Sequence, residues 1–175
     1  MNDTQRSFLD RAATEAQRVQ HPFPAMAACE AALESGFGQS KLAIEGNNLF
    51  GMKQHVHPSF LSFNLPTREF ENGEWVVVPG AEWVKYPTLG DCFSDRLYTL
   101  QRLSGKYPHY AAALAAPDPT TYVMEVSRSW STDPNRATKV ISIYQEYTKP
   151  AVMLDPPNVQ QGPLPAVLPD DIEKV

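Results

Sequence analysis

The chain has 175 residues, 42% hydrophobic and 20% charged, which fits one globular domain with its own core. Its formal net charge of -5 argues against a nucleic-acid binder and against a protein that binds anionic membranes, because both need a basic surface. No stretch approaches the roughly 20 apolar residues of a membrane-spanning helix.

Two helices are predicted in the first 35 residues. From Thr4 to Val19, apolar side chains recur at helical spacing behind a cap at Asp3 or Thr4. Pro24 suits the first turn of a second helix, and the segment 25–33 is small and apolar on almost every side. We expect this second helix to lie in the middle of the domain.

Glycines and polar residues then break the helical pattern. Ser35, Gly36 and Gly38 predict the end of the second helix, and a short helical turn is expected from Ser40. The turn leads into a polar, glycine-bounded loop at residues 46–48.

Three short strands are predicted between Leu65 and Tyr86, at residues 67–71, 75–78 and 82–86. The pair Asn72-Gly73 between the first two is a strong signal for a hairpin turn.

Helices return after the strands. An apolar stripe predicts one long helix from Thr88 to Leu103, and shorter helices are expected from Pro108, Pro119 and Pro134. The sequence therefore predicts an α+β fold that is mainly helical with one small antiparallel β lobe. We expect one domain over residues 1–148 and, because six prolines follow Lys149, a proline-rich tail or linker over 149–175.

Metal and redox chemistry have little support. Cys29 and Cys92 each lie in an apolar helical pattern and are expected to be buried free thiols in preference to a disulfide. His55 and His57 have no third ligand at convincing spacing, so we expect no metal and no cofactor.

Glu34 is the most informative candidate for chemistry. A carboxylate at the C-terminal end of a small, apolar helix is expected to favour its protonated form, because burial and the helix dipole both disfavour the anion. No Lys or Arg lies in that last turn to compensate. A protonated acid of this kind can donate to a glycosidic oxygen. The alternative is that Glu30 and Glu34, one turn apart, mark a solvated face.

Two blocks of sequence carry a family resemblance. Residues 31–43 (AALESGFGQSKLA), followed by residues 47–53 (NNLFGMK), resemble the signature of the glucosaminidase family, glycoside hydrolase family 73. Residues 67–73 (TREFENG) and 131–134 (STDP) resemble the β-lobe and late helical segments of its flagellar rod-assembly member.

The resemblance implies a lysozyme-like domain that cleaves the β-1,4 bond after N-acetylglucosamine in peptidoglycan. It implies that Glu34 is the general acid and that Glu69 falls where a second carboxylate has been proposed. Glu71 and Glu74 compete for that second position, and the substrate's own acetamido group offers a further route. The alternation of side chains along a strand places Glu69 and Glu71 on one face, so spacing alone does not choose between them.

This sequence departs from the family pattern at two positions. Trp130 stands where members usually have a tyrosine, and Arg136 replaces a tyrosine often found after the Pro. Trp can stack on a sugar but offers no hydroxyl, so another residue such as Tyr122 is a candidate for that role.

Sugar recognition combines flat apolar faces with amide and hydroxyl donors. The candidates with these properties near the expected cleft are Phe37, Asn48, Phe50, Tyr110, Tyr122 and Trp130. Asn48 is the strongest of them by position, since it is polar and lies in a glycine-bounded loop.

Three other functions remain open at this stage. One is a muramidase or lytic transglycosylase acting on the same glycan, another is a non-catalytic peptidoglycan-binding module, and the third is a structural helical protein. Analysis of the reducing-end sugar separates the enzymes from one another.

The expected partner is the peptidoglycan glycan strand, with no nucleic acid and no membrane insertion, and the expected state is a monomer. Action at the bacterial cell wall or periplasm is expected although the N-terminus lacks a secretory signal pattern. Export is then expected through a holin, a specialised secretion system or a larger assembly. The C-terminal tail is a candidate for contact with that export or assembly partner.

Overall fold

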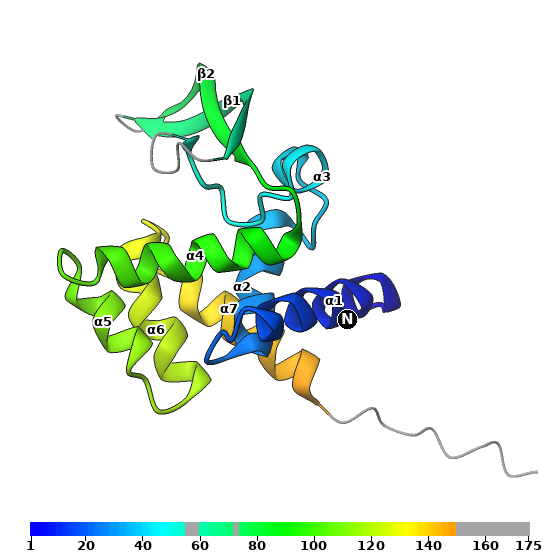
Figure 1. Cartoon of the computed structure of the whole chain (residues 1–175), viewed down its shortest axis with the longest axis vertical. Coiled ribbons are helices and arrows are strands. Elements are labelled where there is room, and N and C mark those ends of the chain that lie inside the picture. Colours follow the sequence, from blue (N-terminus) through cyan, green and yellow to red (C-terminus); the bar gives the residue numbers. More distant parts are fainter. Residues whose placement is uncertain (55–59, 72–73, 150–175) are drawn as a thin grey trace, which may run out of the picture.

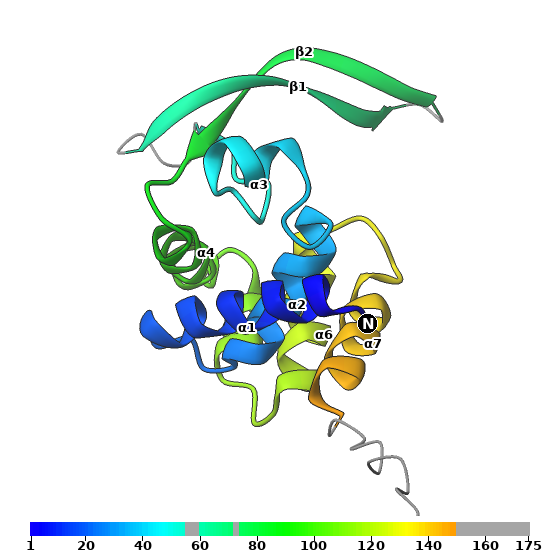
Figure 2. The ribbon, with the colours of Figure 1, turned by 90° about the vertical axis from the view of Figure 1, so that its right-hand side faces the viewer.

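The computed structural model describes residues 1–54, 60–71 and 74–149. In these residues a body of helices carries a two-stranded antiparallel hairpin at one end (Figure 1). The short helix α3 lies between the hairpin and the body (Figure 2). The predicted mainly helical α+β architecture with a small β lobe is confirmed.

The first helix, α1, spans Asp3–Arg18, one residue earlier at each end than predicted. Its cap is Asn2, and the prediction of a cap at Asp3 or Thr4 was wrong. The Asn2 side chain accepts a hydrogen bond from the Gln5 N–H while the Gln5 side chain accepts one from the Asn2 N–H. This capping box satisfies two of the donors left free at a helix start.

The second helix, α2 (Pro24–Ser35), lies at the centre of the body against α1, α6 and α7 (Figure 2). Six of its small or apolar residues from Met26 to Ala32 are almost fully buried, as the all-round apolar pattern predicted. It ends at Gly36, whose φ of 59° is the left-handed conformation that favours glycine. This position fixes the last turn of α2 and the side chains on it.

The hairpin consists of β1 (Leu61–Glu71) and β2 (Glu74–Lys85). They pair from Leu61 with Lys85 to Glu71 with Glu74. The prediction of three strands was wrong, because residues 75–78 and 82–85 belong to one strand, β2, that continues through Pro79-Gly80. A shift in register between Leu65 and Thr67 lets the ladder continue on both sides of this point. The predicted turn residues 72 and 73 lie outside the described residues.

The short helix α3 (Lys41–Gly46) follows Ser40, where a short helical turn was predicted, and supports the base of the hairpin. A Cβ added at Gly46 would clash with the Phe63 ring on β1, so the ring packs directly on the glycine backbone. The Gly46 carbonyl accepts a hydrogen bond from the Tyr86 N–H at 2.8 Å. These contacts join the hairpin to the helical body.

The remaining helices are α4 (Leu89–Leu103), α5 (Pro108–Leu114), α6 (Pro119–Trp130) and α7 (Arg136–Thr148). Their order and type were predicted, but α7 begins at Arg136 and not at Pro134. Pro134 lies in a turn in which the Arg136 N–H donates to the Asp133 carbonyl. This turn places Arg136 at the first residue of the helix.

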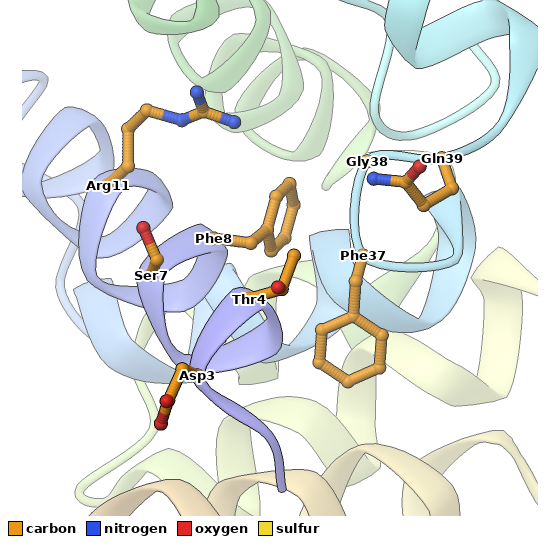
Figure 3. Close-up of a pocket in the computed structure, with 8 residues that line it drawn as sticks. All are labelled: Asp3, Thr4, Ser7, Phe8, Arg11, Phe37, Gly38 and Gln39. Atoms are coloured by element: carbon orange, nitrogen blue, oxygen red, sulfur yellow. The ribbon is translucent and has the colours of Figure 1, made fainter.

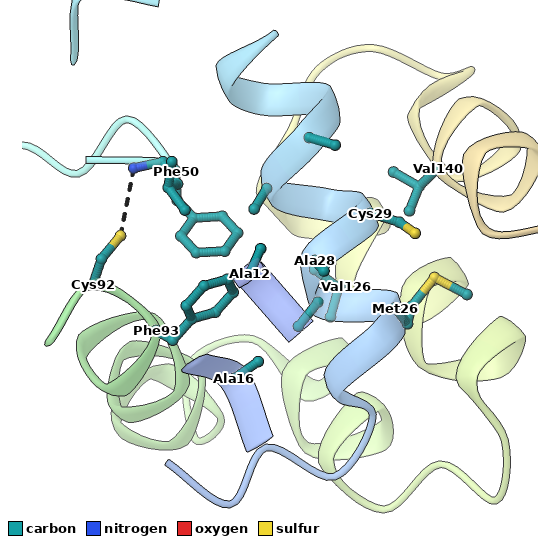
Figure 4. Close-up of a cluster of buried hydrophobic side chains, with 14 of the residues drawn as sticks. Ala12, Ala16, Met26, Ala28, Cys29, Phe50, Cys92, Phe93, Val126 and Val140 are labelled. Atoms are coloured by element: carbon teal, nitrogen blue, oxygen red, sulfur yellow. Dashed lines mark hydrogen bonds between the residues drawn. The ribbon is translucent and has the colours of Figure 1, made fainter. Parts of the chain in front are cut away.

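The core lies where α1, α2, α4 and α6 meet, and Figure 4 shows part of it. Phe50 and Phe93 contact edge to face, with 5.4 Å between their ring centroids. Cys29 and Cys92 are buried and unpaired, as predicted, and burial raises the pKa of each thiol to about 12. Neither thiol therefore ionises near neutral pH.

No helix within the described ranges is both long and apolar enough to cross a bilayer.

His21 is a buried imidazole held in its neutral form between α1 and α2. Its Nδ1 accepts a hydrogen bond from the Phe23 N–H at 3.0 Å, and its Nε2 lies 3.2 Å from the Tyr122 hydroxyl. The pKa of His21 is lowered to about 4, mainly by burial, with the nearby Arg96 guanidinium adding to this effect and Glu30 opposing it.

We predict that this histidine makes the fold sensitive to mild acid. The unfolded chain binds a proton on His21 below about pH 6.5. Because the folded pKa is about 4, the folded state binds that proton only near pH 4. The free energy of unfolding should therefore fall as the pH drops through this window, by on the order of 2–3 kcal/mol.

Urea denaturation at about pH 7 and about pH 4.5 measures this loss, and a His21→Gln variant provides the control without a titrating group. An equal loss in both proteins would contradict the prediction.

Candidate functional site

A groove of ≈ 500 Å³ runs between the helical body and the base of the hairpin. Its lining comes from the end of α2, the loop after α3, β2, α4, α5 and the end of α6. The lining residues are Glu34, Phe50, Gly51, Met52, Lys53, Trp83, Thr99, Leu103, Tyr110, Trp130 and Ser131. Among the described residues, Glu34 is the one carboxylate in this lining.

Glu34 lies in the last turn of α2 and reaches the groove. Its side chain is 27% exposed, so the expected burial was wrong. The expectation of an uncompensated anion was also wrong. The Arg136 Nε, from α7, donates to Glu34 Oε1 at 2.7 Å. The compensating cation comes from a residue 102 positions away, where no pattern within α2 reveals it.

Arg136 uses all three of its nitrogens in this region. Nε donates to Glu34, Nη1 donates to the Ser127 hydroxyl at 2.9 Å and Nη2 donates to Glu30 Oε1 at 2.9 Å. The residue is 1% exposed. Its planar guanidinium is therefore fixed by partners on α2 and α6, and this fixes the side from which it approaches Glu34.

Glu30 is the buried partner of two arginines. Arg136 Nη2 lies 2.9 Å and Arg96 Nη2 lies 3.4 Å from Glu30 Oε1. Burial opposes the ionisation of Glu30, but the Arg96 and Arg136 guanidinium groups outweigh it and lower its pKa. The alternative of a solvated face shared by Glu30 and Glu34 was wrong, because Glu30 is 1% exposed.

Arg96 connects this buried cluster to the wall of the groove. Its guanidinium carbon lies 3.4 Å from the ring centroid of Trp130 and 5.3 Å from that of Phe50. Such stacking is attractive and directional. The Trp130 indole is thus supported from behind by a buried cation while it lines the groove.

Three of the six residues predicted to bind sugar line the groove, and three do not. Phe50, Tyr110 and Trp130 line the groove together with Glu34. Asn48 and Tyr122 do not, and their expected placement is corrected. The Asn48 amide is buried and bonds the carbonyls of Met52 and Val84, while the Tyr122 hydroxyl is buried against His21. Both side chains satisfy polar groups of the interior.

Phe37 faces a different hollow, which corrects its expected place in the cleft. This hollow of ≈ 430 Å³ lies between α1 and the turn after α2 (Figure 3). Its lining residues are Asp3, Thr4, Ser7, Phe8, Arg11, Phe37, Gly38 and Gln39. The Phe37 ring contacts Phe8 edge to face at a centroid distance of 6.2 Å. Phe37 therefore belongs to the packing of α1.

The second predicted carboxylate, Glu69, lies on β1 opposite Val76. The structure describes the backbone but not the side chains of Glu69 and Glu71. His55 and His57 lie outside the described residues. Glu74, at the start of β2, is exposed. The distance between Glu34 and a second carboxylate thus stays a prediction. Within the described ranges, no three His, Cys, Asp or Glu residues gather as a metal site would require.

Sequence reasoning missed Arg96, Lys53 and Trp83. Arg96 lies on the apolar stripe of α4, and a charged residue on a buried face was the available signal. Lys53 and Trp83 form an isolated bridge across the base of the hairpin, with Lys53 Nζ 5.7 Å from the Trp83 centroid. That pairing depends on the tertiary structure.

The arrangement offers a carboxyl group beside aromatic faces in an open groove. Because Glu34 Oε1 is engaged by Arg136, the second oxygen is the one available to a molecule in the groove. A carboxyl group held in this way can exchange a proton with a bound ligand. Indole and phenol rings beside it suit the apolar face of a sugar.

Comparison with known proteins identifies relatives over most of the chain. Residues 10–149 match the family described as mannosyl-glycoprotein endo-beta-N-acetylglucosaminidase. The exo-glucosaminidase LytG of Bacillus subtilis (strain 168) is 29% identical over 150 residues. The match covers 83% of this chain and 52% of LytG, so the chain spans about half the length of that relative.

Solved structures show the same fold. The catalytic domain of the autolysin Auto from Listeria monocytogenes has a TM-score of 0.69 at 23% identity, covering 84% of this chain and 86% of that domain. A truncated glycoside hydrolase domain of Salmonella typhimurium FlgJ has a TM-score of 0.64 at 29% identity, covering 81% and 96%. The lysozyme-like fold of the glucosaminidases that the sequence predicted is confirmed.

The Glu30 carboxylate is expected to be essential for stability. Glu30→Gln keeps the shape but removes the negative charge that both buried guanidinium groups contact. Breaking a buried ion pair in this way typically costs about 3–5 kcal/mol.

Chemical denaturation of Glu30→Gln and of Glu45→Gln, an exposed position on α3, measures the difference. Equal stability of the two variants would show that the buried cluster contributes little.

Proposed function

We propose that this chain, which belongs to the mannosyl-glycoprotein endo-beta-N-acetylglucosaminidase family, is a glycoside hydrolase that cleaves peptidoglycan. The bond cleaved is the β-1,4 linkage after N-acetylglucosamine. The observation that carries this proposal is the position of Glu34, a carboxyl group fixed by Arg136 in a groove with aromatic walls.

Glu34 acts as the general acid. Its Oε1 stays on the Arg136 Nε, and the proton passes from Oε2 to the glycosidic oxygen as the C–O bond breaks. Charge develops on the sugar ring during this step, in an oxocarbenium-like transition state. The open side of the groove lets a long polymer enter and leave.

Water attacks the anomeric carbon as the C–O bond breaks, and an assisting carboxylate accepts the proton of that water. Glu69 is the proposed assisting carboxylate, on the hairpin whose second strand contributes Trp83 to the groove. A gap of about 6.5–9.5 Å between the two carboxyl groups would leave room for the attacking water and would give inversion. Participation of the substrate's acetamido group is the other route, and it would leave Glu69 an auxiliary role.

The groove walls are proposed to bind the sugar rings. Trp130 and Tyr110 have ring centroids 6.5 Å apart, and both line the groove with Phe50. Aromatic faces of this kind bury the apolar side of a pyranose. Trp130 is the principal platform, because Arg96 fixes its plane from behind.

The names of the relatives support action at the bacterial cell wall. One is an autolysin, another is a domain called a glycoside hydrolase, and LytG is named an exo-glucosaminidase. The family description specifies an endo-acting enzyme. We propose the endo mode for this chain, since the groove is open and not a closed pocket.

The test is digestion of purified peptidoglycan by the wild type, by Glu34→Gln and by the matched surface variant Glu45→Gln. Products are reduced with borohydride and identified by mass. We expect reduced N-acetylglucosamine ends from the wild type and from Glu45→Gln. Loss of the general acid should lower the rate of Glu34→Gln by about 10²–10⁴-fold.

Other products identify the alternatives. Muramic-acid or anhydro ends would show a muramidase or lytic transglycosylase. Binding without cleavage, unchanged in Glu34→Gln, would show a non-catalytic module. Release of single sugars in place of longer fragments would contradict the endo mode.

A further inference from the structure

We propose that Arg136 is a positioning residue for catalysis, which holds the Glu34 carboxyl group at the groove and is itself held by Glu30 and Ser127. This inference rests on the proposed function. It assigns a role to a residue that does not line the groove.

The Arg136 guanidinium bonds residues of the interior and also a residue that lines the groove. Nη1 and Nη2 donate to Ser127 and to the buried Glu30, each at 2.9 Å. Nε donates at 2.7 Å to Glu34, whose side chain is 27% exposed to the groove. One rigid guanidinium therefore connects the interior to the carboxyl group that faces the substrate.

Neutralising Glu30 does not by itself require Arg136. Arg96, which is also 1% exposed, already lies 3.4 Å from Glu30 Oε1. The feature that Arg136 adds is the Nε bond to Glu34. Because a guanidinium is planar, fixing two of its nitrogens also fixes the direction of the third N–H. One oxygen of the Glu34 carboxyl group is thus held by this bond, and in the proposal the other oxygen serves the ligand.

Lysine is a poor substitute for this geometry. An ammonium group keeps the charge but is a single point on a flexible stem, so it cannot reach Ser127, Glu30 and Glu34 in one plane. Comparing Arg136→Lys with Arg136→Gln therefore separates the effect of the positive charge at residue 136 from the effect of the planar guanidinium.

The experiment measures kcat and KM on soluble peptidoglycan glycan fragments for the wild type, Arg136→Lys and Arg136→Gln. Arg128→Gln is the matched control, because Arg128 is an exposed arginine of α6 that pairs with Glu125 at 3.7 Å outside the groove. Circular dichroism and thermal melting verify that each variant is folded.

A double variant, Glu30→Gln with Arg136→Gln, covers the case in which a single change fails to fold. It removes one buried anion and one buried cation together, so the formal charge of the cluster is unchanged, while Arg96 loses its contact with the Glu30 carboxylate. Glu34 nevertheless loses its donor in this variant.

A misplaced catalytic group typically costs about 100-fold in rate, so we expect kcat of Arg136→Gln and of the double variant to fall by about that factor. KM should stay within about threefold, because Arg136 does not line the groove. Arg136→Lys should recover part of kcat, and Arg128→Gln should match the wild type.

A folded Arg136→Gln or double variant with the wild-type kcat would overturn the proposal, and so would a loss confined to KM. Absence of cleavage by the wild type would refute the proposed function instead, so the two failures are distinguishable.

Discussion

The structure depends on one buried carboxylate, Glu30, that holds two arginines from other parts of the chain. Glu30 lies on α2, Arg96 on α4 and Arg136 on α7, and all three residues are 1% exposed. A charge that is buried without its partner costs several kcal/mol. The three helices must therefore meet in one arrangement, with α2 between the other two.

The same cluster connects the interior to the groove at two points. Arg96 lies behind Trp130, the aromatic wall, and Arg136 donates to Glu34, the carboxyl group in the lining. The proposed general acid and the proposed sugar-binding surface are thus fixed by a common interior group. A site whose contact residues are supported by a rigid interior keeps its geometry when substrate enters. The fold and the proposed chemistry are stabilised by the same contacts.

Local patterns predicted most of the fold, and contacts between distant residues account for what they missed. Helical periodicity and proline or glycine signals placed the helices within a few residues, and Gly36 marked the end of α2 correctly. Glu34 was predicted as a candidate because most residues of its helix are small and apolar, and it does line the groove. The sequence did not reveal the arginine partners of the two glutamates, because Arg136 lies 102 residues from Glu34 and Arg96 lies 66 residues from Glu30.

The interpretation of Asn48 as a sugar-binding residue was wrong, because a polar loop residue can bond buried carbonyls as well as a ligand. The strand break expected at Pro79-Gly80 was wrong because a register shift lets the ladder continue.

The most direct test is a crystal structure of Glu34→Gln with a glycan fragment of peptidoglycan. The arrangement described above predicts a sugar ring against Trp130 and a glycosidic oxygen within about 3 Å of the residue 34 amide, with Arg136 still bonded to that side chain. A glycan bound only in the hollow beside Phe37, or one whose glycosidic oxygens all lie far from residue 34, would contradict it.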